Sequence, residues 1–129
     1  TAKAYNILRL ARSINNSAIT SLERMTREIK SADNISMADS TFGTHPGKLK
    51  INISADTKEF YIDNGTLKIK ETGVDKGALT LDGVSVDNLV FRNIDNGTSK
   101  AVRIEMTLSG THRNITNTKK FYSFVVLRN

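Results

Sequence analysis

The feature that most constrains the fold is an amphipathic helix pattern that runs without interruption from the first residue to Ala32. Small or apolar residues recur at steps of three or four, the spacing that aligns side chains on one face of an α-helix. These residues are Ala4, Ile7, Ala11, Ile14, Ala18, Leu22, Met25, Ile29 and Ala32. The pattern predicts one long helix over residues 1–33.

The start of this helix lacks the usual signals. A helix normally opens with a capping side chain and an acidic first turn. Thr1 supplies a cap, but Lys3, Arg9 and Arg12 carry the wrong charge for the positive end of the helix dipole. We therefore interpret residues 1–33 as the lower part of a longer helix.

Composition narrows the classes of protein. A chain of 129 residues forms one domain with room for a hydrophobic core. The absence of cysteine excludes a disulfide framework, a thiolate zinc site and a thiol nucleophile. The net charge of +6 favours anionic partners such as nucleic acid, but apart from the helix and Lys119-Lys120 the basic residues are interleaved with acidic ones.

Beyond Pro46 the period of the apolar residues changes from 3.6 to 2, which is typical of half-buried β-strands. Residues 34–47 are predicted to connect the helix to an antiparallel sheet formed by residues 48–129. Within that sheet Asn64-Gly65 favours a two-residue type I′ turn, because both residues tolerate positive φ. Residues 58–63 and 66–71 are therefore predicted to pair as a β-hairpin.

The rest of the sheet region shows further strands and turns. Residues 72–81 and 110–118 are rich in glycine or polar side chains and predict loops. Asp87-Asn88 interrupts an alternating segment and predicts a bulge or bend. Residues 119–128 are apolar on both faces, which is typical of a central strand covered on both sides.

Together these patterns predict an α+β fold, with a long N-terminal helix packed on one face of an antiparallel β-sheet. Residues 1–129 form a single domain in this prediction, and the lower helix packs on the sheet through Leu22, Met25 and Ile29. The upper helix has too little sheet to cover it, so its side chains are predicted to contact neighbouring helices in an assembly. The candidate contact residues are Ile7, Leu8, Arg9, Arg12 and Ile14.

Motifs that carry chemistry are absent from the sequence. His45 and His112 are the only histidines, and both lie in polar segments where an exposed loop position is the simpler interpretation. The chain has no glycine-rich phosphate loop, no histidine pair with metal-ligand spacing and no nucleophile elbow. We therefore predict no catalytic, cofactor or metal site, and no enzymatic activity.

Three segments carry a resemblance to a known family. They are LERMTREI at 22–29, LTLDGVSVDNLVF at 79–91, and the ending formed by AVRIEMTL at 101–108 and FYSFVVLRN at 121–129. In this order and spacing the chain resembles the soluble part of type IV pilin-like proteins, closest to minor pilins and minor pseudopilins. The basic leader, the processing site and the apolar membrane helix that define the family are not in the sequence.

The resemblance implies a fold, a location and a function. It implies a pilin-like domain, anchored in the cytoplasmic membrane by an upstream apolar segment and lying outside that membrane or in an extracellular filament. It implies a structural subunit of a type IV pilus-like or type II secretion-like filament. The partners would be other pilin or pseudopilin subunits, contacted through the N-terminal helix, with no small-molecule substrate.

Two alternatives to this function stay open. The net positive charge also suits a nucleic-acid-binding pilin-like subunit of a DNA-uptake system, with Arg9, Lys119 and Lys120 as contacts. A concave sheet could also serve an enzyme or a ligand-binding domain, which would require a deep pocket with converging polar groups.

Overall fold

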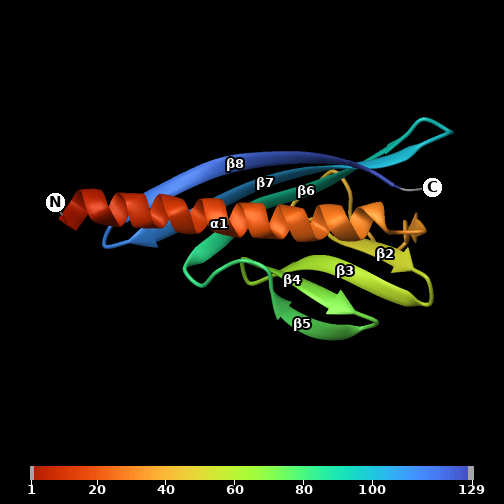
Figure 1. The fold of residues 1–129 in the computed structure, drawn as a ribbon, viewed down its shortest axis with the longest axis horizontal. Helices are drawn as coiled ribbons and strands as arrows, with labels where there is room; N and C mark the ends of the chain where they lie inside the picture. Colours follow the sequence, from red (N-terminus) through yellow and green to blue (C-terminus); the bar gives the residue numbers. More distant parts are fainter. Residues whose placement is uncertain (1, 128–129) are drawn as a thin grey trace.

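The structure is a computed structural model that describes residues 2–127. One helix precedes eight strands (Figure 1). The elements are α1 (Ala2–Lys30), β1 (Asn34–Ile35), β2 (Leu49–Ile53), β3 (Asp56–Asp63), β4 (Thr66–Glu71), β5 (Val74–Ala78), β6 (Val84–Asp95), β7 (Lys100–His112) and β8 (Ile115–Val126). Thr1, Arg128 and Asn129, which belong to the predicted helix and last strand, lie outside the described residues.

The strands form two sheets, and the predicted α+β fold with one antiparallel sheet beneath the helix is therefore wrong. One sheet has the order β1-β2-β3-β4-β5 and the other the order β6-β7-β8, with antiparallel pairing throughout. In Figure 1 α1 runs along the length of the molecule, with β6–β8 on one side of it and β2–β5 on the other. The predicted sheet of residues 48–129 is thus divided between β5 and β6.

Another segment pairs with the middle of the β6 edge, and Val86 N, near the start of β6, donates to the Gly65 carbonyl of the β3–β4 turn at 2.8 Å. The main chain of Gly43 and of Gly47 donates hydrogen bonds to the carbonyls of Phe91 and Leu89, at 2.9 and 2.8 Å. His45 Nδ1 accepts the Leu89 N–H at 2.8 Å, so this histidine is held in a structural role. We call residues 42–47 the edge loop, since they take the place of a neighbouring strand along β6.

The edge loop depends on a close approach at Gly47. A Cβ at this position would lie 2.7 Å from the Leu89 carbonyl oxygen and 3.0 Å from Phe91 Cδ2. We expect Gly47→Ala to lower the free energy of unfolding by on the order of 1–2 kcal/mol, because the backbone of β6 cannot move away cheaply. Chemical denaturation would measure this, and Thr44→Ala in the same loop, at an exposed position, should leave the midpoint unchanged. Equal stability of the Gly47 variant and the wild type would contradict the close approach.

The predicted hairpin around Asn64-Gly65 is confirmed. β3 and β4 pair in the register Asp63↔Thr66, and Asn64 and Gly65 have φ values of 53° and 80°. The predicted irregularity at Asp87-Asn88 is also confirmed, since the β6–β7 register shifts between Val86 and Asn88. In both cases a local sequence signal determined the local backbone.

Three predicted loops contain strands instead. Residues 72–81 include β5, which follows a two-residue turn with φ values of 50° at Thr72 and 80° at Gly73. Residues 110–118 contain the end of β7 and the start of β8, joined at Arg113-Asn114 with φ values of 49° and 68°. The connecting segment 34–47 includes the short strand β1. These turns use residues such as threonine and arginine that rarely signal positive φ.

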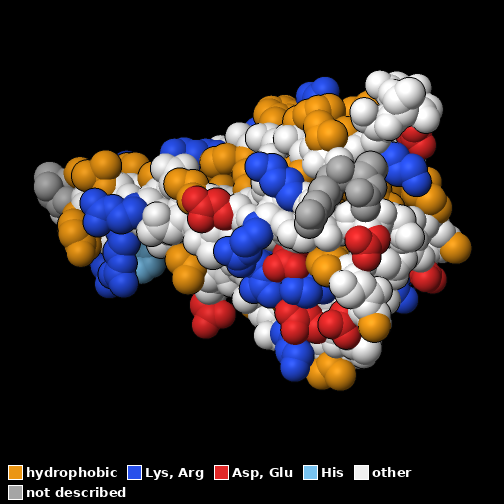
Figure 2. Space-filling model, turned by 45° about the vertical axis from the view of Figure 1, so that its right-hand side comes forward, with side chains coloured by type: hydrophobic (Ala, Val, Ile, Leu, Met, Phe, Trp, Pro, Cys, Tyr) orange, Lys and Arg blue, Asp and Glu red, His pale blue; other side chains and the backbone are white. Residues whose placement is uncertain are grey.

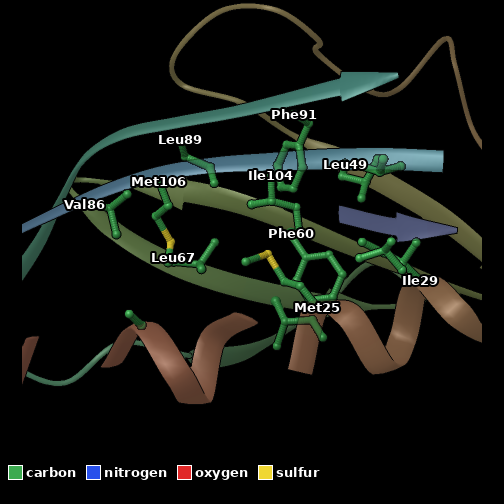
Figure 3. Packing of buried hydrophobic residues seen from close by; sticks show 14 of the residues in the cluster. Met25, Ile29, Leu49, Phe60, Leu67, Val86, Leu89, Phe91, Ile104 and Met106 are labelled. Atoms are coloured by element: carbon green, nitrogen blue, oxygen red, sulfur yellow. The ribbon is translucent and has the colours of Figure 1, made fainter. Parts of the chain in front are cut away.

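The main core lies between α1 and the inner faces of both sheets. Met25 of α1 lies beside Phe60 of β3, and Met106 of β7 lies beside Leu67 of β4 (Figure 3). All four side chains are at most 1% exposed. The close packing joins the helix and the two sheets in one hydrophobic cluster.

A charged cluster joins the lower helix to the first sheet. It consists of Arg24 and Glu28 of α1 with Lys58 and Glu71 of β3 and β4. Lys58 Nζ lies 2.5 Å from Glu28 Oε2, and Arg24 Nη2 donates to Glu71 Oε1 at 3.1 Å. Glu28 is the most deeply placed of the four, with a side chain only 11% exposed. Opposite charges therefore meet across the boundary between helix and sheet.

Candidate assembly surface

The sheets cover α1 only from Leu10 onward, and the residues before it carry exposed apolar side chains. Tyr5 and Leu8 are each 64% exposed and Ile7 is 41% exposed. Figure 2 shows hydrophobic and basic side chains side by side at this end of the molecule. Large apolar groups gathered in water at one helix end are a favourable contact surface for another protein. We call the exposed residues Tyr5, Ile7, Leu8, Arg9 and Arg12 the helix surface.

Arg9 and Arg12 add positive charge to the helix surface. Both are exposed, and within residues 2–127 no acidic side chain lies within ion-pair distance of either guanidinium. By contrast Arg24, lower on the same helix, is paired with Glu28 and Glu71. The unpaired charges suit an acidic partner or an anionic surface.

The structure places the other candidate contact residue differently. Ile14 is fully buried, so its prediction as a contact for neighbouring helices is wrong. The upper helix approaches β7 closely because Gly110 leaves room, and a Cβ there would lie 2.6 Å from Leu10 Cδ1. Leu10 and Ile14 are thereby drawn into the core.

The lower helix faces the sheets through residues named from the sequence. Met25 and Ile29 are fully buried, and Leu22 is half-buried against the core. Ile19, by contrast, is 55% exposed. Ile19 shares a helix face with Asn15 and Thr26. These two residues contact β8: Asn15 Oδ1 accepts a hydrogen bond from Lys119, and Thr26 Oγ1 lies 3.5 Å from Ser123 Oγ. Ile19 is therefore on the side of α1 that faces β8.

A second apolar surface was not expected from the sequence. β8 is the outer strand of its sheet, so the prediction of a central strand covered on both sides is wrong. Three apolar side chains on the outward face of β8 are exposed, and we call them the apolar row. Their exposed fractions are 59% for Tyr122, 58% for Phe124 and 49% for Val126. Alternation identified which residues share a face, but it could not show that one apolar face remains uncovered.

The remaining candidate residues do not converge on a reactive site. His112 and Arg9 line a cleft of about 190 Å³ between α1 and the ends of β6 and β7, together with Asp82. This volume is below the roughly 300–1,000 Å³ of typical ligand pockets. Within residues 2–127 no group of three or more histidine and acidic side chains is arranged to hold a metal ion.

The basic residues proposed for nucleic-acid contact are also separated. Lys119 lies on the inner side of β8 and donates to Asn15 Oδ1 at 3.4 Å, whereas Lys120 is exposed on the outer side. Strand alternation therefore splits the pair between two faces. The two lysines thus do not form one basic patch on a single face of β8.

Comparisons with known proteins leave the family open. Neither models of protein families, nor curated proteins, nor solved structures gave a match to this chain. Among the described residues, no helical segment combines the length and the apolar character needed to span a membrane. The exposed features that bear on function are the helix surface and the apolar row of β8.

Proposed function

We propose that this chain is a structural subunit, of the minor pilin or minor pseudopilin kind, in a type IV pilus-like or type II secretion-like filament. The observation that carries the proposal is the helix surface. Tyr5, Ile7 and Leu8 extend beyond the sheets on a continuous helix, where a neighbouring helix could bury them. Burying an apolar side chain of this size on association contributes about 1.5–3 kcal/mol before the costs of binding.

The proposal includes an anchor and a location. An apolar segment preceding Thr1 would hold the chain in the cytoplasmic membrane and continue α1, with the described domain on the extracytoplasmic side. The coding sequence upstream of Thr1 tests this part directly. We expect roughly 20 consecutive apolar residues there, and a polar or absent upstream segment would overturn the anchor.

The assembly contact is tested by a charge placed on the helix surface. We expect Leu8→Glu to prevent incorporation into the filament in the producing cell, because a carboxylate buried between helices costs several kcal/mol. Immunodetection of the subunit in sheared filaments would measure incorporation. Leu8 is exposed in the isolated domain, so circular dichroism and thermal unfolding of that domain should not change.

Met37→Glu is the matched control for this variant. Met37 is 54% exposed, but it lies in the segment between β1 and β2, away from the helix surface. The control should enter filaments normally. Normal incorporation of Leu8→Glu would contradict assembly through α1. Salt-sensitive DNA binding that is lost in an Arg9→Ala/Arg12→Ala variant would instead favour the DNA-uptake alternative.

A further inference from the structure

The sheet edges of this molecule differ in how they are protected. Natural proteins protect edges by keeping strands short, by placing charges or bulges on them, or by covering them. β1 has two residues, β5 has a register shift beside the exposed Asp75 and Lys76, and the middle of β6 is covered by the edge loop. β8 is a regular strand of 12 residues with no strand beyond it in the described part of the chain.

The pairing register shows which residues of β8 face this open edge. Leu127 N donates to the Lys100 carbonyl at 2.9 Å, and the β7–β8 register continues from there without a shift. Antiparallel pairs alternate between hydrogen-bonded and non-hydrogen-bonded, so the odd-numbered residues of β8 bond to β7. The main-chain N–H and C=O groups of Tyr122, Phe124 and Val126 therefore point to the open edge.

The same three residues carry the exposed apolar row. Residues 121–126 contain no charged side chain, whereas Lys119 and Lys120 interrupt the strand just before them. Backbone groups that can pair and apolar side chains that can be covered thus coincide on residues 120–126. This is the combination that strand addition uses, with main-chain bonds supplying affinity and alternate side chains supplying specificity.

The charges beside the row have one predominant sign. Arg103 lies over the Tyr122 ring, 5.5 Å from its centroid, and 3.6 Å from Glu105 Oε2. Arg92 donates a hydrogen bond to the same carboxylate, which holds the pKa of Glu105 below its usual range. Two arginines share one acid, and Lys120 adds a further exposed charge. A complementary partner is therefore acidic at this end.

We propose that the open edge of β8, residues 120–126, binds an extended segment of another protein as an added β-strand. The added strand has alternating apolar side chains that cover Tyr122 and Phe124, and a carboxylate that meets Lys120 or Arg103. This contact uses residues separate from the helix surface. It can therefore succeed or fail independently of the filament function proposed above.

A synthetic peptide tests the proposal. The probe is a blocked eight-residue peptide of alternating valine and threonine with two glutamates at one end, added to the ¹⁵N-labelled domain. We expect hydrogen exchange at the amides of Tyr122, Phe124 and Val126 to slow by about tenfold or more at saturation, because each amide gains a main-chain acceptor. The same peptide with lysines in place of the glutamates should bind about tenfold more weakly at low salt.

Comparison of Phe124→Pro with Phe124→Ala separates strand addition from nonspecific apolar contact, because both variants remove the ring and only proline also removes the edge N–H. Phe124→Pro removes an edge N–H without removing a β7 hydrogen bond, so the domain should stay folded and lose peptide binding. Thr116→Pro is the control, because Thr116 is also an even-numbered residue whose N–H faces the open edge but lies in the polar half of β8. It should bind the peptide normally, and circular dichroism would check the fold of both proline variants. Unchanged exchange at millimolar peptide, or equal binding by a folded Phe124→Pro variant, overturns the proposal.

Discussion

Phe60→Ala is expected to lower the free energy of unfolding by about 3–5 kcal/mol, since it removes a fully buried aromatic ring and leaves a cavity. Phe60 lies where Met25 of α1 meets the sheets, so the loss loosens the helix and the first sheet together (Figure 3). A domain of this size has a total stability of only about 5–15 kcal/mol. Urea denaturation followed by circular dichroism would measure the shift in midpoint.

Phe124→Ala is the matched control for this change. It deletes the same ring from an exposed position, 58% accessible on the outer face of β8. Its effect on stability should stay within about 0.5 kcal/mol, as for surface substitutions generally. Similar losses at Phe60 and Phe124 would contradict the placement of the core on the inner faces of the two sheets.

Glu28→Ala is expected to cost about 2–3 kcal/mol. It leaves Lys58 and Arg24 with Glu71 as their one remaining acidic partner within residues 2–127, and removes the more deeply buried carboxylate at the boundary between α1 and the first sheet. Breaking a fully buried pair costs roughly 3–5 kcal/mol, and the side chains of Lys58 and Arg24 retain 22% and 30% exposure, which lowers the figure. Thermal unfolding at constant pH would measure the change.

The control for the charged cluster is Glu23→Ala on the same helix. Glu23 is exposed and forms no ion pair within residues 2–127, so its removal should change stability little. A double-mutant cycle of Glu28→Ala with Lys58→Ala should show coupling, because the two groups are in contact. Additive effects would mean that Glu28 acts through packing alone.

Local sequence signals predicted the backbone of individual turns, but they could not predict which distant segments would pair. Asn64-Gly65 specified its hairpin because few residue pairs tolerate two positive φ values. Arg113-Asn114 makes an equally short turn, but arginine at positive φ gives no such signal. The edge loop pairs with β6 some 40 residues later, a long-range contact that no periodicity encodes.

The same limit applies to the candidate surfaces. Helical spacing identified Ile7 and Leu8, and both are exposed, but it also included Ile14, because spacing cannot show how far the sheet extends along a helix. Gly110 sets that extent by letting Leu10 approach β7. The exposure of the apolar row of β8 could not be predicted for a related reason. The sequence shows that this face is apolar, but it does not show whether a second layer of structure covers it.

The edge loop also limits the direction in which the three-stranded sheet can grow. A sheet open at both sides can recruit strand after strand, the route to cross-β polymers. Here the middle of β6 already has its hydrogen bonds to Gly43 and Gly47 of the same chain, so the long uninterrupted edge of the three-stranded sheet is that of β8. Each strand added there would present a new outer edge, so growth of this sheet is directional, away from β6.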